Sequence, residues 1–101
     1  MATPELRPID LARLRAVFAR FPSVQRVRLF GSRATGQARR ASDIDLAVDA
    51  PQMSTREWNE LLEAIDEAPL IYDIDIVRAD SLLPGPLRES VEREGIEIHA
   101  A

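Results

Sequence analysis

The sequence predicts a small α/β protein in which a mixed β-sheet is flanked by helices. Apolar residues recur with helical spacing in some segments and alternate with polar residues in others, and Pro or Gly interrupts the chain between most of them. The expected order is α-β-α-β-α-β-α-β, without an internal repeat or a long linker. A chain of 101 residues is the size of one domain, which we expect to span residues 1–101.

Three long helices are expected from the spacing of their apolar residues. The first covers residues 10–21, with Asp10 as its N-cap and an inward face of Leu11, Leu14, Val17, Phe18 and Phe21. The second opens at a capping box formed by Ser54 and Glu57, and its core positions are Trp58, Leu61, Leu62 and Ile65. The last covers residues 84–94 and ends at Gly95, with Leu87 and Val91 inward.

Four strands fill the intervals between these helices. Residues 24–30 are expected to place Val27 and Leu29 on one face, and residues 43–48 alternate acidic with aliphatic side chains. Residues 70–77 form a third strand, in which Tyr72 is a core or edge contact, and residues 96–98 form a short edge strand. A short helix over residues 32–35 and an arginine-rich loop over residues 37–42 connect the first two strands.

The composition excludes several classes of protein. The chain has no cysteine, which rules out a disulfide framework and thiolate metal sites. Its first residues lack the apolar run of a signal peptide, and no apolar stretch approaches the roughly 20 residues that span a bilayer. We therefore expect a soluble, cytoplasmic protein that does not contact membranes.

Charge is distributed unevenly along the chain. Residues 1–40 hold nine Arg against two carboxylates, whereas residues 41–101 hold four Arg against fifteen carboxylates. The acidic second part disfavours a long nucleic-acid footprint, although residues 1–40 could supply a basic face. Arg33, Arg39 and Arg40 flank a glycine turn, and this positive charge beside a cluster of carboxylates suits a phosphate-and-metal site.

Gly31 and Ser32 follow the first expected strand directly. A glycine at such a turn lets the backbone approach phosphate oxygens without a clash at Cβ. A helix that begins at Ser32 would direct free N–H groups toward an anion, and the Ser32 hydroxyl adds a donor. A strand-Gly-Ser turn is common, so it indicates phosphate binding only together with the carboxylates that follow.

Two aspartates of the second expected strand share one face. Because side chains alternate along a strand, Asp43 and Asp45 point to the same side. Neighbouring carboxylates repel each other unless a cation neutralises them, and hard oxygen ligands suit Mg²⁺. Asp73 and Asp75 of the third strand share a face in the same way, and one of them could join the cation pair or accept a proton from an attacking hydroxyl.

The run GSRATGQARRASDIDLAV, residues 31–48, contains Gly-Ser, ten intervening residues and Asp-x-Asp. This spacing resembles the signature of the polymerase-β-like nucleotidyltransferases, above all their short prokaryotic branch, the minimal nucleotidyltransferases. The C-terminal run YDIDIVRADSLLPGPLRESVEREGIEIHA is similar to the usual ending of that branch. The resemblance covers about residues 24–100 and implies the palm-like core of that superfamily.

The resemblance also implies roles for individual residues. Gly31 and Ser32 match the turn that grips the triphosphate, with Ser42 beside the phosphates, and Asp43 and Asp45 match the metal ligands. Asp75 matches the third carboxylate better than Asp73, which remains the alternative if the strand register differs by two. For Arg33, contact with phosphate and an outward, solvated side chain both remain open.

The function that the resemblance implies is nucleotidyl transfer with two Mg²⁺ ions and a nucleoside triphosphate. Members of the branch are often antitoxins that transfer AMP from ATP to a tyrosine of a helical HEPN ribonuclease toxin, and a chain this short has no room for an acceptor-binding domain. Two alternatives remain: a non-catalytic antitoxin that masks its partner, and nucleotidyl transfer to RNA or a small molecule.

Overall fold

The computed structural model describes residues 3–39 and 41–101, and helices and strands alternate in it as the sequence predicts. Its elements are α1 (Pro8–Ala19), β1 (Arg26–Phe30), α2 (Ser32–Thr35), β2 (Ile44–Asp49), α3 (Thr55–Glu67), β3 (Ile74–Arg78), the 3-10 turn η1 (Ala79–Ser81), α4 (Pro86–Glu94) and β4 (Ile96–Ala100). Among the helices of the described ranges, none has the length and apolar character needed to cross a bilayer.

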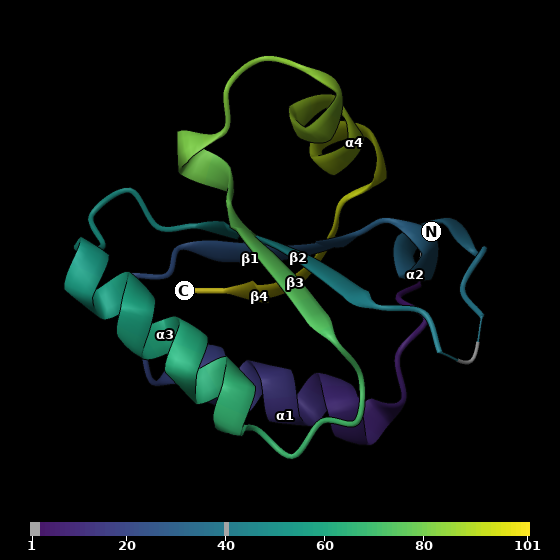
Figure 1. Cartoon of the computed structure of the whole chain (residues 1–101), viewed down its shortest axis with the longest axis horizontal. Helices are drawn as coiled ribbons and strands as arrows, with labels where there is room; N and C mark the ends of the chain where they lie inside the picture. The colour runs from purple at the N-terminus through teal and green to yellow at the C-terminus, as the bar shows by residue number, and fades with distance from the viewer. Residues whose placement is uncertain (1–2, 40) are drawn as a thin grey trace.

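The four strands form one mixed sheet in the order β3-β2-β1-β4. β1 is antiparallel to both β2 and β4, whereas β2 and β3 are parallel because α3 returns the chain across the sheet before β3 begins. Figure 1 shows α1 and α3 on one face of this sheet and α4 with η1 on the other. The predicted fold class, a small mixed sheet flanked by helices, is confirmed.

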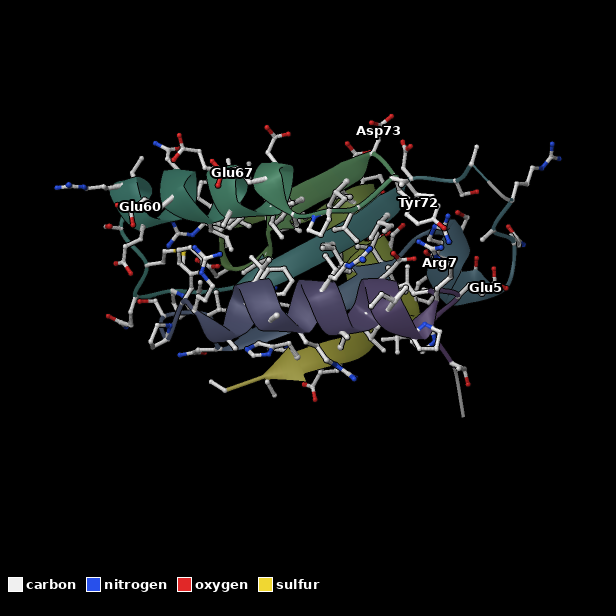
Figure 2. All side chains as sticks on the ribbon, turned by 90° about the horizontal axis from the view of Figure 1, so that it is seen from below. Glu5, Arg7, Glu60, Glu67, Tyr72 and Asp73 are labelled. Carbon is white, nitrogen blue, oxygen red and sulfur yellow. The ribbon has the colours of Figure 1, made fainter. Side chains whose placement is uncertain are left out.

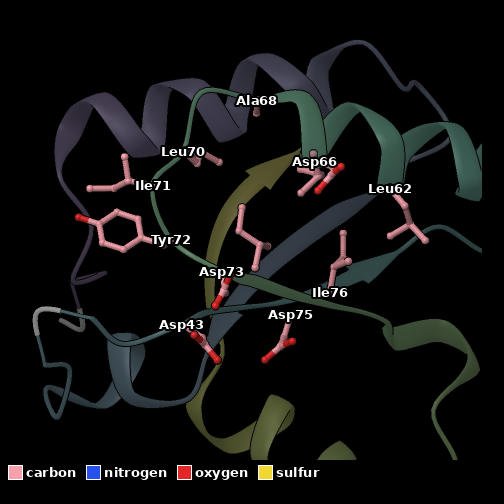
Figure 3. A pocket seen from close by; sticks show the side chains of 12 residues that line it. Asp43, Leu62, Asp66, Ala68, Leu70, Ile71, Tyr72, Asp73, Asp75 and Ile76 are labelled. Carbon is pink, nitrogen blue, oxygen red and sulfur yellow. The ribbon is translucent and has the colours of Figure 1, made fainter.

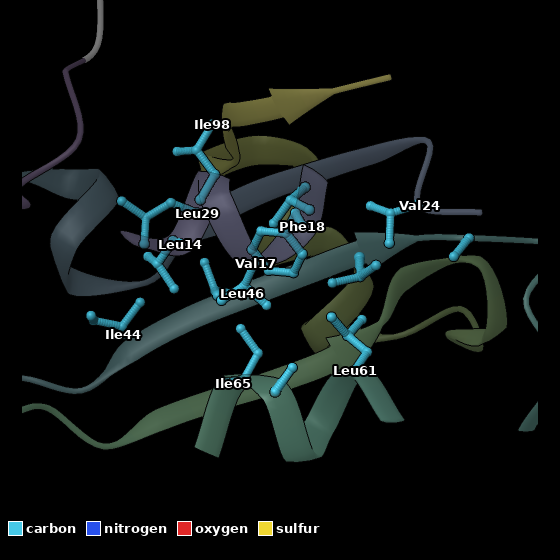
Figure 4. Packing of buried hydrophobic residues seen from close by; sticks show 14 of the residues in the cluster. Leu14, Val17, Phe18, Val24, Leu29, Ile44, Leu46, Leu61, Ile65 and Ile98 are labelled. Atoms are coloured by element: carbon cyan, nitrogen blue, oxygen red, sulfur yellow. The ribbon is translucent and has the colours of Figure 1, made fainter. Parts of the chain in front are cut away.

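The main core lies between the sheet and the pair α1 and α3 (Figure 4). Leu14 and Phe18 of α1 are completely buried, as is Leu61 of α3. They pack against alternate residues of the strands, among them Val27, Leu29, Ile44, Leu46 and Val48. Because alternate residues of β2 are buried on this side, the intervening positions of the strand face α4.

A smaller cluster on the opposite face holds α4 to the sheet. Val91 of α4 packs there against Phe30 of β1 and Ala47 of β2, and all three are buried. Leu87 lies one helical turn earlier and is 44% exposed, so the prediction that it points inward is wrong. The cluster beneath α4 is small, and Leu87 lies outside it.

Several boundaries differ from the sequence-based prediction. α1 begins at Pro8, so Asp10 is not its N-cap but lies in its first turn, fully buried and bound by Arg7. Ser54 and Glu57 do form the predicted capping box. β3 begins at Ile74 rather than at residue 70, and Leu70 and Tyr72 instead pack from the preceding loop onto the main core.

Candidate active site

Three aspartates come together where β2 and β3 begin. In the parallel register of these strands, Asp45 lies opposite Asp75. Asp43 comes just before β2 and shares the side of Asp45 because side chains alternate. Figure 3 shows Asp43 and Asp75 extending away from α1 and α3, toward the face that carries α4.

Among the described residues, no ion pair compensates the negative charge of this group. The pKa of Asp45 is raised above its ordinary value, first by burial of its carboxyl group and then by the charges of Asp75, Asp43 and Glu94. Both causes disfavour the ionised form of Asp45. A bound cation would relieve the repulsion, so the electrostatics of the group favour a metal or another positive charge.

Asp73, the alternative to Asp75 as the third carboxylate, lies two residues earlier in the chain. Asp73 precedes β3 and contributes its backbone carbonyl, which accepts a 2.9 Å hydrogen bond from the Ile44 N–H. Its side chain lines a pocket of about 650 Å³ between the end of α3 and β3, together with Asp66, Tyr72 and other residues (Figure 3). Asp43 and Asp75 border this pocket too, so it opens beside the group of three aspartates.

Gly31 packs directly against the carboxylate of Asp45. Its φ of 76° lies in the left-handed region, and a Cβ at this position would overlap Oδ2 of Asp45. The turn after β1 is therefore in contact with the Asp45 carboxylate of β2. From the sequence, we expected glycine here because it lets the backbone approach phosphate. The structure adds a second reason, which is that a side chain at this position would overlap the Asp45 carboxylate.

Ser32 begins α2, which is a single turn of four residues. The N–H groups of Ala34 and Thr35 donate to the Gly31 carbonyl and close this turn at 3.0 and 3.2 Å. With so few peptide units, α2 contributes a small dipole, and individual N–H groups matter more than the helix as a whole. Ser32 itself is partly exposed beside Gly31, where its hydroxyl can reach a ligand.

Glu94, the last residue of α4, also belongs to this site. Its carboxylate accepts a 3.2 Å hydrogen bond from the Gly31 N–H and contributes to the raised pKa of Asp45. Glu94 is not among the site residues predicted from the sequence. No local pattern marks it, because its contact with Gly31 joins residues 63 positions apart.

The loop before Asp43 is held by its own hydrogen bonds. The hydroxyl of Ser42 accepts a 2.7 Å bond from the Arg39 N–H, and the carbonyl of Ser42 accepts two bonds from the guanidinium of Arg33. Ser42 thus has a defined place one residue before Asp43. Arg39 is exposed, and Arg40 lies outside the described residues.

Arg33 is buried beside the site. It is only 7% exposed, so it is not an outward, solvated arginine. Its guanidinium bonds to the carbonyls of Ser42 and Glu5 and stacks at 4.5 Å on the ring of Tyr72, which occupies its donors inside the protein rather than at the Gly31 turn. The expected contact role of Tyr72 is confirmed, since its ring also packs against the main core.

The donor set fits Mg²⁺ better than a preformed, all-protein metal cage. Asp43, Asp45 and Asp75 offer hard carboxylate oxygens, and Mg²⁺ in proteins takes one or two carboxylates and completes its shell with phosphate and water oxygens. Within the described residues, no three acidic or imidazole side chains are arranged so that they could hold a metal ion by themselves. Such a site would need oxygens from a bound nucleotide.

Comparison with protein families gives a match over most of the chain. The model of the family described as "Polymerase beta, Nucleotidyltransferase" matches residues 12–101. This range contains the Gly31 turn, all three aspartates and Glu94. No protein with a curated description matches the sequence.

Solved structures of toxin-antitoxin systems are similar to this one. A toxin-antitoxin crystallised with AMP-PNP has a TM-score of 0.72 and 26% identity, over 91% of this chain and 74% of that chain. A mutant MntA-HpeT toxin-antitoxin, with two aspartates spaced two positions apart changed to glutamate, has a TM-score of 0.68 and 26% identity, over 95% and 75%. A toxin-antitoxin MntA-HepT structure, at 23% identity and a TM-score of 0.61 over 94% and 74%, shares the fold.

Proposed function

The chain belongs to the polymerase beta nucleotidyltransferase family, and from this premise we propose that it transfers AMP from ATP to a partner protein in a magnesium-dependent reaction. The observation that carries this proposal is the placement of Asp45 opposite Asp75, with Asp43 on the same side and Gly31 packed against the Asp45 carboxylate. Carboxylates grouped beside a glycine turn are the parts that a nucleotidyl-transfer site requires.

Each residue has a defined part in the proposed reaction. The Ser32 hydroxyl binds oxygens of the triphosphate, as does the Gly31 N–H when a phosphate oxygen replaces Glu94 as its acceptor, and Ser42 lies beside them. Asp43, Asp45 and Asp75 would hold Mg²⁺, which neutralises charge on the triphosphate and its leaving group. Two ions fit this set of three carboxylates when phosphate and water oxygens complete their shells.

Asp75 is the proposed proton acceptor. An acceptor hydroxyl forms a bond to the α-phosphorus as the bond between the α-phosphorus and its bridging oxygen breaks, so that pyrophosphate leaves and AMP remains on the acceptor. The proton of that hydroxyl passes to the Asp75 carboxylate. Asp75 is exposed and lies at the sheet edge formed by β3, where an acceptor from another molecule can approach.

We propose that the acceptor is a tyrosine of a HEPN-family toxin, and that the chain is the antitoxin of the pair. The similarity to toxin-antitoxin structures, one of them with AMP-PNP, supports an antitoxin role and a nucleotide substrate. The main alternative is masking, in which the chain inactivates the toxin by binding alone. The grouped carboxylates argue against masking, because a binding surface gains nothing from their mutual repulsion.

Turnover distinguishes catalysis from masking. The chain is mixed at a small molar ratio with the toxin that co-purifies with it, in the presence of Mg²⁺ and ATP, and intact-protein mass spectrometry follows the toxin. We expect a large excess of toxin to gain the mass of AMP and to stay inactive after this chain is removed. In chelator, neither AMP transfer nor ATP binding should occur.

Two variants complete this test. Asp75→Ala should bind the toxin but transfer no AMP, because it lacks the proton acceptor and one ligand. Glu63→Ala removes an exposed carboxylate of α3 and should transfer AMP as the unmodified chain does. If Asp75→Ala neutralises the toxin at equal stoichiometry without a change in mass, masking is the mechanism and the catalytic proposal is wrong.

A further inference from the structure

Arg33 is a charged side chain that the proposed reaction does not use, yet it is 93% buried next to the site. Its Nε and Nη2 donate to the same carbonyl, that of Ser42, at 3.0 and 2.8 Å. Its Nη1 donates to the carbonyl of Glu5 at 2.8 Å. Burial of a guanidinium is costly unless its donors are hydrogen-bonded, so the burial of Arg33 depends on these bonds.

The N-terminal segment covers Arg33 from outside. The Glu5 N–H donates to the Arg33 carbonyl at 2.8 Å, which pairs the two residues through both their backbone and the Arg33 side chain. Tyr72 lies 4.5 Å from the Arg33 guanidinium and 5.9 Å from that of Arg7, which in turn binds buried Asp10. Figure 2 shows Glu5, Arg7 and Tyr72 gathered near the start of α1.

These contacts connect the two halves of the site. Arg33 follows Ser32 in α2, whereas the Ser42 carbonyl belongs to the peptide group that leads into Asp43. Asp43 lies before the first residue of β2, so it is at the end of a loop rather than within the strand ladder. Two N–H donors on one carbonyl restrict the orientation of the peptide group between Ser42 and Asp43. They thereby restrict the position of the Asp43 Cα, from which its side chain extends.

We infer that Arg33 is a positioning residue that holds Asp43 at a set distance from the Gly31-Ser32 turn. This inference rests on the proposed function, because Asp43 is there a magnesium ligand. The role requires arginine, since its planar fork supplies donors in two directions at once and its flat face stacks on Tyr72. A lysine supplies a single nitrogen and cannot reproduce both the paired bonds to Ser42 and the bond to Glu5.

The chain contains a matched control at the other end of the sheet. Arg78 of β3 donates through Nη2 to the carbonyls of Ala50 and Met53, at 2.7 and 2.5 Å, and lies 5.7 Å from the ring of Trp58. It resembles Arg33 in binding two carbonyls beside an aromatic ring, and differs from it in also pairing with the Asp80 carboxylate at 3.2 Å. Arg33→Lys and Arg78→Lys should therefore lower the melting temperature alike, but only Arg33→Lys should disturb Asp43.

The first measurement is the Mn²⁺ concentration that gives half-maximal binding of AMP-PNP, determined by calorimetry on the full chain. In Arg33→Lys we expect this concentration to rise roughly 10- to 100-fold, the usual effect of losing a residue that orients a metal ligand. In Arg78→Lys it should stay within about twofold of the unmodified chain, because that change is remote from the ligands. Equal shifts in both variants, or none in either, would overturn the inference.

The second measurement does not depend on metal or nucleotide. Amide hydrogen exchange of residues 41–44 should become faster in Arg33→Lys and remain unchanged in Arg78→Lys, compared at temperatures equally far below each melting point. Unchanged exchange in Arg33→Lys overturns the inference. If the unmodified chain binds AMP-PNP equally well without metal, the proposed function fails, while the exchange comparison still decides whether Arg33 holds this loop.

A further variant serves if Arg33→Lys does not fold. Tyr72→Leu keeps the hydrogen bonds of Arg33 but removes the ring that covers its face. We expect a smaller rise in the Mn²⁺ requirement and a smaller gain in exchange of residues 41–44. If Tyr72→Leu behaves as the unmodified chain in both measurements while Arg33→Lys remains unfolded, the inference is wrong.

Discussion

Asp45 of β2 and Asp75 of β3 lie opposite each other on adjacent parallel strands. β3 is the edge strand of the sheet. Like charges placed directly across two strands destabilise a sheet. Asp45 is also partly buried, and its pKa is raised by that burial and by its acidic neighbours. The site therefore lowers the stability of the metal-free protein.

Asp45→Asn should raise the melting temperature in chelator at pH 7. The pKa of Asp45 is higher in the folded chain than in the unfolded chain, so its contribution to stability is present at low pH and lost as the pH rises through the folded pKa. At pH 7 the ionised carboxylate opposes folding, and asparagine removes that charge. Differential scanning calorimetry measures the effect; a lower melting temperature would make Asp45 a structural residue.

A bound nucleotide and metal should reverse the order of the two melting temperatures, so that the unmodified chain melts above Asp45→Asn. Mg²⁺ with AMP-PNP should stabilise the unmodified chain, because a ligand that binds only the folded state raises its stability. The same mixture should leave the melting temperature of Asp45→Asn unchanged. Stabilisation of both proteins to the same extent would remove Asp45 from the proposed metal ligands.

Gly31→Ala should abolish nucleotide binding, with Gly36→Ala as its control. Gly36 is in the left-handed helical conformation (φ 77°, ψ 16°), where alanine costs about 1–2 kcal/mol of stability, whereas Gly31 (φ 76°, ψ −155°) is in a conformation nearly confined to glycine, where alanine costs more. Only at Gly31 would the new Cβ overlap the Asp45 carboxylate, whereas at Gly36 its nearest neighbour is Glu5 Oε1 at 3.7 Å. Thermal melts should show a loss for both variants, and a larger one for Gly31→Ala.

Calorimetry with Mg²⁺ and AMP-PNP then separates the two glycines. Gly36→Ala should retain binding, because its cost is confined to the backbone. Loss of binding in both variants would show that the strain of the turn, rather than contact between Gly31 and Asp45, governs the site.

Glu94→Gln should tighten nucleotide binding. Glu94 accepts the Gly31 N–H bond that a phosphate oxygen would otherwise receive, and it adds negative charge beside Asp45. Removing one charge near a triphosphate should increase affinity by about fivefold, equivalent to about 1 kcal/mol. Glu92→Gln, an exposed residue of α4 paired with Arg88 at 3.2 Å, is the control and should not change affinity. Weaker binding in Glu94→Gln would instead make Glu94 a ligand.

The predictable parts of this protein are those encoded by local patterns. The capping box at Ser54, the burial of Leu14 and Leu61, and the common side of Asp43 and Asp45 follow from helical and strand periods of neighbouring residues. The pairing of Asp45 with Asp75 depends on the register of β2 and β3, which no local pattern records.

Contacts between distant segments could not be predicted from the sequence. The sequence neighbours of Arg33 are those of a solvated arginine in a polar loop. Only its hydrogen bonds to the carbonyls of Glu5 and Ser42 explain why its side chain is buried. Asp10 looked like a helix N-cap because it precedes an apolar run, but Pro8 at the first helical position starts α1 earlier and carries Asp10 into the interior.

The ion pair between Arg7 and Asp10 should make stability depend on acid pH. Asp10 is fully buried, and the hydrogen bond from the Arg7 guanidinium, 2.8 Å long, lowers the pKa of Asp10 below its ordinary value of 3.8 despite that burial. A carboxyl group whose folded pKa is depressed contributes stability above the unfolded pKa and loses it as the pH falls through the folded pKa.

We therefore expect Arg7→Gln to reduce the free energy of unfolding at pH 7, because it leaves Asp10 buried without its charged partner. The difference between this variant and the unmodified chain should shrink as the pH falls below about 3.8. Urea unfolding between pH 2.5 and 7 measures both effects. Arg56→Gln is the control: Arg56 pairs with Glu60 at 3.6 Å on the surface and should contribute little at any pH. If the Arg7→Gln difference is the same at every pH, Arg7 stabilises the fold through its contact with the Tyr72 ring rather than through the charge of Asp10.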